Sequence, residues 1–154
     1  MILTTHILSG ALVGAEIKNP FYVAIVSVML HFLIDLFPHG DYLNKKSRLW
    51  EFWKVAVDLA VGLGIVFAII FFRNSTGNTT LLANIGIGIF FSLLPDGTTL
   101  LYMIGMKYFK PIYNFHQKLH LAPDFSPERE FRLKNNLWDI LISLISLYFL
   151  LSRL

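Results

Sequence analysis

The sequence predicts an all-α protein, a polytopic transmembrane helical bundle of about five membrane segments that forms one domain over residues 1–154. Hydrophobic residues make up 55% of the chain and charged residues only 15%, against roughly 25% charged residues in soluble domains. The mean hydropathy is +0.61, and the apolar residues gather in five runs. The chain is therefore expected to be an integral membrane protein.

The first three apolar segments differ in length. Residues 2–16 and 20–37 are short, and the tight Lys-Asn-Pro loop between them predicts a helical hairpin whose second arm opens at Pro20. Residues 50–72 are long and apolar enough to cross a membrane as one helix. Together these segments predict a short hairpin followed by a full membrane span.

The last two segments enclose a polar stretch. Residues 79–104 contain Pro95, which is expected to break the helix because proline removes a backbone hydrogen bond. Residues 105–128 are polar and are expected to form a loop with a short helix near 109–120. Residues 129–152 return to an apolar pattern and predict a final membrane helix.

The basic residues predict an orientation. If each segment crosses the membrane once, the N-terminus and the loops at 38–49 and 105–128 share one side. That side holds ten Lys and Arg residues, and the opposite side holds three, namely Lys18, Arg73 and Arg153. Positively charged loops face the cytoplasm, so the chain is expected in the inner (plasma) membrane with the first side cytoplasmic. This pattern favours membrane lipids over nucleic acid as partners and leaves a homo-oligomer open.

Most of the unusual polar residues fall on that same side. His31, Asp35 and His39 are spaced by four and would share one helix face, unless Pro38 turns His39 away. Imidazole and carboxylate are ligands for zinc and similar divalent ions, and the chain has no cysteine. An aspartate within a membrane costs roughly 2.5–3.5 kcal/mol on insertion scales, so a shared cation is expected to compensate several. The predicted metal ligands are His6, His31, Asp35, His39, Asp58 and Asp96, and catalytic roles are expected for His39 and Asp35.

Each candidate also has a simpler explanation. His31 can be a buried core histidine, and His6 can be part of a polar helix start. Asp58 can pair with Lys54 one turn earlier, and Asp96 can cap a short helix that follows it. The metal interpretation therefore depends on the set and not on any one residue.

A histidine pair lies in the polar stretch. His116 and His120 have the i, i+4 spacing of a metal-binding helix, but they lack the adjacent glutamate of a metalloprotease motif. The pair equally suits a position facing lipid phosphates. The weaker expectation is that a substrate headgroup contacts His116, Lys118 and His120.

The chain also contains a faint internal repeat. His6 is followed by "LFPHGD", and Asp58 is followed by "LLPDGT". If the match reflects a duplication, it predicts two related helical hairpins plus a C-terminal helix. Each hairpin would place one ligand at the start of a helix and another at the end of the next.

Three motifs carry a resemblance. The stretches "THILSG", "HFLIDLFPHGD" and "LLPDG" resemble the prokaryotic membrane-bound metal-dependent hydrolase families, and the His31-x-x-x-Asp35 spacing is similar to that of all-helical zinc-dependent phospholipase C enzymes. The chain lacks the Pro-Asp-x-Asp-His and His-Arg-Gly-x-x-His-Ser motifs of the commoner hydrolase pattern. The resemblance covers about residues 4–41 and 90–98 and implicates as ligands His6, His31, Asp35, His39 and Asp96.

The resulting expectation is a membrane-embedded, metal-dependent hydrolase that cleaves a phosphoester in a lipid or lipid-linked substrate. Its cofactor is expected to be a divalent ion, with zinc favoured by the ligand types. The alternative is a non-catalytic membrane protein that binds or transports a divalent ion with the same residues. A third interpretation is a scaffold in which the polar groups only satisfy one another.

Overall fold

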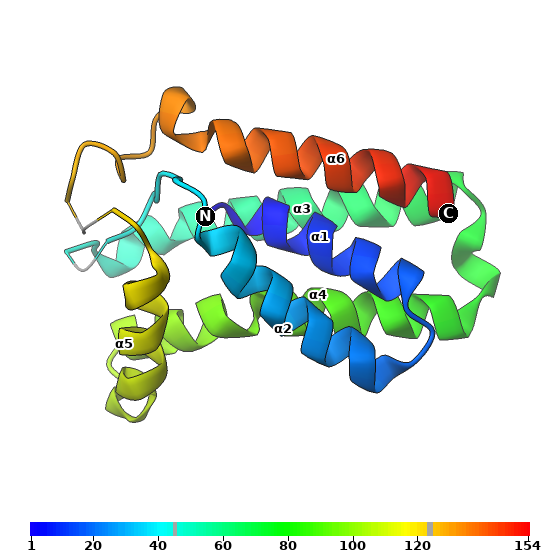
Figure 1. Cartoon of the computed structure of the whole chain (residues 1–154), viewed down its shortest axis with the longest axis horizontal. Coiled ribbons are helices and arrows are strands. Elements are labelled where there is room, and N and C mark those ends of the chain that lie inside the picture. The colour runs from blue at the N-terminus through cyan, green and yellow to red at the C-terminus, as the bar shows by residue number, and fades with distance from the viewer. Residues whose placement is uncertain (45, 123–124) are drawn as a thin grey trace.

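The computed structural model describes residues 1–44, 46–122 and 125–154, and it confirms the all-α prediction (Figure 1). No β-strand occurs among these described residues, although Asp41 and Glu130 form an isolated parallel bridge. The α-helices are α1 (Leu3–Glu16), α2 (Pro20–Asp35), α3 (Trp53–Phe72), α4 (Thr79–Met103), α5 (Lys110–Leu119) and α6 (Leu137–Arg153). Short 3₁₀ turns are η1 (Leu49–Phe52), η2 (Ser75–Gly77), η3 (Lys107–Phe109) and η4 (Leu133–Asn136).

Three helices are long and apolar enough to cross a membrane: Trp50–Phe72, Thr79–Met103 and Leu133–Arg153. The predicted number of about five spans is not confirmed. Helices α1 and α2 have 14 and 16 residues, which at 1.5 Å per residue gives roughly 21 and 24 Å, less than the ~30 Å of the hydrocarbon layer. The short hairpin is present as predicted, but its arms are too short to span.

Helix α1 lies at the centre of the bundle. It packs against α2, α3, α4 and α6, and most of its residues are buried, including the polar side chains of Thr5, His6 and Ser9. The surrounding helices expose large apolar side chains such as Phe67 and Phe90. This pattern, with polar groups inside and apolar groups outside, is typical of a bundle surrounded by lipid.

Glycines allow α1 and α4 to cross closely. A Cβ atom added at Gly88 would lie 2.1 Å from the Gly10 carbonyl oxygen, and one added at Gly14 would lie 2.3 Å from the Asn84 carbonyl oxygen. Close backbone approach at small residues is a common way to pack membrane helices. By contrast, Gly86 on the same helix has nothing within 4 Å of its added Cβ position. The crossing sets the distance between the residues that α1 and α4 contribute to the site.

Carboxylates from two neighbouring helices cap the N-terminus of α1. Its own N-cap residue, Ile2, makes no side-chain cap bond. Instead Asp58 on α3 accepts from the backbone N–H groups of Leu3 and Thr4, and Asp139 on α6 accepts from the N–H of Ile2. The free N–H groups of a helix start attract negative charge. These bonds fix the start of α1 between α3 and α6.

Helix α4 continues through Pro95, so the expected break at this residue is wrong. The helix runs from Thr79 to Met103 with Pro95 inside it. Proline cannot donate a backbone hydrogen bond and crowds the turn before it. The carbonyl that loses its usual helical donor is that of Phe91, four residues earlier. The neighbouring Ser92 carbonyl accepts from His31 Nδ1 of α2 at 2.7 Å.

The polar segments gather at one end of the bundle. The N-terminus, the loop after α2, helix α5 and the loop before α6 lie at that end, and the C-terminus lies at the other (Figure 1). This is the grouping that the alternating topology predicts for the N-terminus and the two polar loops. Its assignment to the cytoplasmic face stays a prediction.

Candidate metal centre

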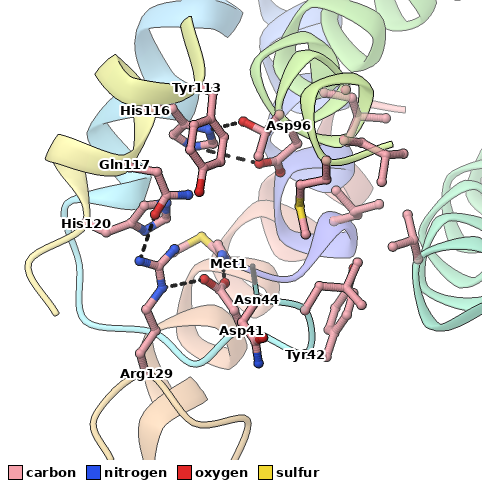
Figure 2. A pocket seen from close by; sticks show the side chains of 18 of the residues that line it. Met1, Asp41, Tyr42, Asn44, Asp96, Tyr113, His116, Gln117, His120 and Arg129 are labelled. Atoms are coloured by element: carbon pink, nitrogen blue, oxygen red, sulfur yellow. Dashed lines mark hydrogen bonds and ion pairs between the residues drawn. The ribbon is translucent and has the colours of Figure 1, made fainter. Parts of the chain in front are cut away.

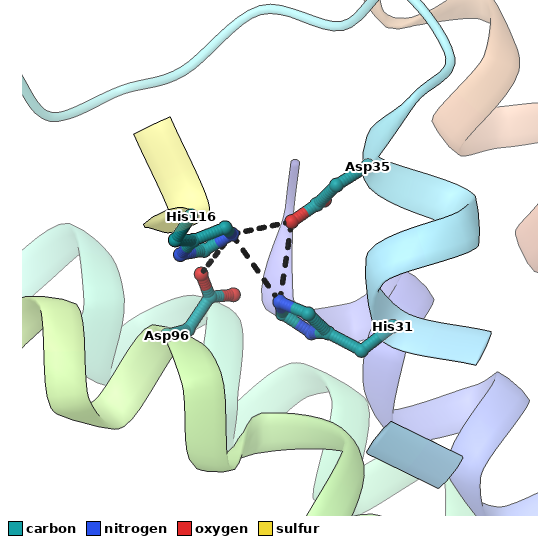
Figure 3. A group of neighbouring side chains, drawn as sticks. All are labelled: His31, Asp35, Asp96 and His116. Atoms are coloured by element: carbon teal, nitrogen blue, oxygen red, sulfur yellow. Dashed lines mark hydrogen bonds and ion pairs between the residues drawn. The ribbon is translucent and has the colours of Figure 1, made fainter. Parts of the chain in front are cut away.

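Four potential metal ligands from three helices meet near the polar end of the bundle (Figure 3). They are His31 and Asp35 of α2, Asp96 of α4 and His116 of α5, and one ligand atom from each lies within 4.8 Å of all the others. Asp96 is partly exposed, and the other three are buried. We call these four residues the first group.

Both histidines of the first group are anchored through Nδ1. His31 Nδ1 lies 2.7 Å from the Ser92 carbonyl oxygen, and His116 Nδ1 lies 2.9 Å from the Thr99 hydroxyl. A carbonyl oxygen only accepts, so we assign the proton of His31 to Nδ1. The Thr99 hydroxyl can donate or accept, and for His116 we also take the Nδ1-protonated tautomer, the one that can bind a metal through Nε2. Each Nε2 then carries a lone pair, and the two Nε2 atoms lie 3.3 Å apart. This is how metal-binding imidazoles are usually held.

Asp35 completes a cluster of hydrogen-bond acceptors. Its Oδ2 atom lies 2.6 Å from His116 Nε2 and 3.2 Å from His31 Nε2. With the Nδ1 protons assigned above, these three atoms all present lone pairs to one another. Such a contact is stable only with a proton or a cation among them, because buried acceptors without a partner are unfavourable.

His6 supplies a further nitrogen at the edge of the first group. Its Nε2 lies 3.3 Å from Asp35 Oδ1 and 3.8 Å from Asp96 Oδ2. Its ring stacks on that of His31 with the centroids 4.1 Å apart. The side chain is fully buried, and neither ring nitrogen has a hydrogen-bond partner among the described residues. His6 is therefore available as an additional ligand.

A second group lies beside the first and consists of His39, Asp41 and His120. One ligand atom from each lies within 4.8 Å of the others. His39 Nδ1 lies 2.7 Å from the Phe37 carbonyl oxygen, which directs Nε2 toward Asp41 Oδ1 at 3.6 Å. The His39 and His120 rings are 4.9 Å apart between centroids. The second group thus repeats the carbonyl-anchored imidazole of the first.

Asp41 already faces two positive groups. Arg129 Nε donates to its Oδ2 at 2.7 Å, and the N-terminal amine of Met1 donates to its Oδ1 at 2.8 Å. Burial tends to raise the pKa of Asp41, but the amine, His39 and Arg129 outweigh burial and hold that pKa below its usual value. Asp41 is therefore ionised at neutral pH.

The two imidazoles of the second group are uncharged at neutral pH. Burial, followed by repulsion from the Met1 amine, lowers the pKa of His39 to about 4. Burial and the same amine hold the pKa of His120 well below its usual value. Each histidine would gain a proton only at a pH below its lowered pKa, so each keeps a nitrogen lone pair available at neutral pH.

A cavity of about 260 Å³ adjoins both groups (Figure 2). Its lining includes Asp96 and His116 of the first group and Asp41 and His120 of the second. The remaining wall is largely apolar and includes Leu3, Val55, Leu59, Leu93, Leu100 and Met103. The cavity therefore joins an apolar chamber to a polar end rich in metal-ligand side chains.

The structure brings together most of the predicted ligands but not Asp58. That carboxylate accepts from Leu3, Thr4 and Tyr42 instead of joining either group. The simpler expectation, a pair with Lys54, is not what the structure shows either, because Lys54 Nζ lies 3.6 Å from Glu51. The expected equivalence of the two hairpins fails at this position: His6 reaches the site, whereas Asp58 holds the start of α1.

The structure places the two histidines of the predicted i, i+4 pair in potential metal sites, and their contact with a substrate headgroup stays a prediction. His116 belongs to the first group and His120 to the second, whereas Lys118 between them is exposed. Their i, i+4 spacing was the signal that could have identified them as ligands. Asp41 was also missed, although it follows the predicted ligand His39 by two residues.

Comparison with known proteins identified no relative of this chain. No family model matches this chain, and neither the curated proteins nor the solved structures gave a significant match. The resemblance to metal-dependent hydrolases therefore gains no support from these comparisons. The function is inferred instead from geometry. Two His/Asp groups border one cavity within a helical bundle of the membrane type.

Proposed function

We propose that this protein is a membrane-embedded, metal-dependent hydrolase that cleaves a phosphoester in a lipid or lipid-linked substrate. One observation carries the proposal: two anchored imidazoles and two carboxylates converge within 4.8 Å beside a largely apolar cavity. The types of ligand atom in the first group fit a metal ion. Nitrogen and oxygen ligands of this kind suit zinc and similar divalent ions.

The residues of the first group would have different roles in binding the ion. His31 and His116 would hold the ion through Nε2, because Ser92 and Thr99 bind their opposite nitrogens. Asp35 would add a charged oxygen from inside the bundle. A bound divalent ion lowers the pKa of a coordinated water to about 7 and polarises a phosphoryl oxygen.

The cavity supports a lipid as the substrate. Asp96 and His116 line it, so a substrate in the cavity would lie against the proposed ion. The leucine, valine and methionine side chains of its wall suit an acyl chain, because burying apolar surface is favourable. A phosphoester at the polar end with its chain in the apolar part matches both surfaces.

The first test measures metal and hydrolysis together. The chain is purified in detergent, its bound metal is measured, and cleavage of phospholipids is assayed with and without a chelator. We expect bound divalent metal and cleavage that is lost in the chelator and restored by added ion. Full turnover in the chelator would overturn the mechanism, whereas bound metal with no cleavage of any phosphoester lipid would favour the alternative metal-binding protein.

A matched pair of glycine variants tests the cavity. A side chain added at Gly97 would enter open space at the cavity wall, and one added at Gly86 would enter open space elsewhere on the same helix. We expect Gly97→Leu to lower lipid cleavage with bound metal retained, and Gly86→Leu to have little effect. Equal activity in both variants would show that the substrate does not occupy this cavity.

A further inference from the structure

We propose that a second divalent cation binds between His39, Asp41 and His120, so that two ions border the cavity. The inference deepens the proposed function and rests on a metal at the first group. It makes the site a two-ion centre. As a ligand through Nε2, His39 would hold the ion and would not also take the catalytic role expected from the sequence.

The first step is the orientation of His39. Its Nδ1 donates to the Phe37 carbonyl oxygen at 2.7 Å, so Nε2 carries the lone pair. That Nε2 lies 3.6 Å from Asp41 Oδ1. The arrangement parallels His31, whose Nδ1 is held by the Ser92 carbonyl. A carbonyl behind an imidazole fixes both its tautomer and its direction toward a metal.

The second step is the set of unsatisfied atoms. His39 Nε2 and His120 Nδ1 are buried and have no hydrogen-bond partner among the described residues. Leaving a buried polar atom unpaired is unfavourable. One cation among the three side chains would give His39 Nε2 a partner and add charge complementarity with Asp41.

The third step is the position next to the first group. His116 and His120 are one turn apart, with their ring centroids separated by 5.0 Å. Asp41 and His120 border the same cavity as Asp96 and His116 (Figure 2). Paired metal ions in phosphoesterases stabilise the attacking and the leaving oxygen of one phosphoryl group. The two groups are placed to act on one substrate in this way.

Asp41 can accommodate the ion together with Arg129. A carboxylate offers lone pairs on both oxygens, and Arg129 Nε occupies Oδ2. The Met1 amine is bound to Oδ1, on the side that faces His39. Binding of the ion therefore requires this amine to move aside. The competing explanation is that the amine and Arg129 are the only cations that neutralise Asp41.

The test is the metal stoichiometry of the full chain in detergent. Zinc content is measured after gel filtration, and cobalt is titrated into the metal-free protein by calorimetry. We expect two ions per chain in the wild type and one in His120→Ala or His39→Gln. Asp35→Asn should lose the other ion and keep the second. Lys118→Ala, an exposed position on the same helix as His116, should keep both ions.

The outcomes separate this inference from the proposed function. One ion in the wild type, unchanged in His120→Ala and His39→Gln but lost in Asp35→Asn, would overturn the second site and leave the first intact. No bound ion in the wild type would overturn both. Thermal unfolding of each variant identifies loss of metal caused by misfolding, and His39→Gln, outside the helices, provides the second measurement if His120→Ala does not fold.

Discussion

Two aspartates within apolar helices, Asp35 and Asp58, have opposite surroundings. The oxygens of Asp58 meet hydrogen-bond donors: the backbone N–H groups of Leu3 and Thr4, the Thr4 hydroxyl and the Tyr42 hydroxyl. The oxygens of Asp35 meet the imidazole nitrogens of three histidines. The difference lies in the partners, most of which come from other parts of the chain.

The partners decide what each carboxylate can do. Hydrogen-bond donors stabilise the Asp58 carboxylate without an ion, so its role is to hold the start of α1. Anchored imidazoles offer lone pairs to Asp35, so this carboxylate still requires a positive charge. A buried charge without compensation is expensive in a membrane. Asp58, whose oxygens meet donors, is therefore structural, and Asp35, whose oxygens meet oriented acceptors, is a candidate ligand.

The largest expected effect follows from Asp35→Asn. The change removes the charge at the centre of the first group, so the affinity of that group for zinc should fall by more than ~100-fold, beyond the 10–100-fold typical of losing an outer-shell partner. Competition with a metal-sensitive dye in detergent measures it. Unchanged affinity in a folded Asp35→Asn protein would place the ion elsewhere.

A smaller loss of affinity is expected from Thr99→Val. Valine keeps the shape of threonine but cannot bind His116 Nδ1, so the imidazole loses its anchor and zinc affinity should fall about 10–100-fold. Thr98→Val is the matched control, because the Thr98 hydroxyl bonds to the Pro95 carbonyl. An equal loss in both variants would mean that the anchor is not the cause.

Asp58→Asn should affect stability and not metal. The amide would point N–H groups at the donors that now bind Asp58, and the free energy of unfolding should fall by about 1–3 kcal/mol. Thermal unfolding in detergent and metal analysis on the same sample measure both quantities. Loss of metal with unchanged stability would return Asp58 to the site and remove the contrast with Asp35.

The smallest effect is expected from Asp139→Asn. Asp139 Oδ1 accepts from the Ile2 N–H and contacts the Thr5 hydroxyl, whereas Oδ2 has no hydrogen-bond partner among the described residues. Asparagine keeps the accepting oxygen, so the free energy of unfolding should change by less than about 1 kcal/mol. A loss as large as that of Asp58→Asn would show that the charge itself supports the start of α1.

The hydropathy pattern of the sequence was sufficient to predict the helices but not their full arrangement in space. The apolar runs identified every long helix, because each run is long and is bounded by polar loops. The continuous helix through Pro95 was not foreseen, because proline disfavours a helix interior locally, whereas α4 is held by packing against α1 and α2. The positions of the shorter helices α1 and α2 also depend on packing inside the bundle.

The candidate site was likewise predictable only in part. His31 and Asp35 could be grouped from their spacing alone, because residues four apart share a helix face. The split of His116 and His120 between two groups could not, since α5 ends at Leu119 and His120 follows it with an extended backbone. Asp58 was misassigned because an isolated aspartate in an apolar run has the same appearance whether donors or acceptors surround it.

The sequence by itself determined the all-helical class, the apolar helices and the gathering of histidines and aspartates toward one end, because hydropathy and spacing are properties of the linear chain. Only the tertiary structure decided which of those side chains meet, which nitrogen of each imidazole is free and which carboxylate is already satisfied. The physical reason is that a hydrogen bond or a metal ligand is selected by direction over a few ångströms, and directions between separate helices are set by their packing.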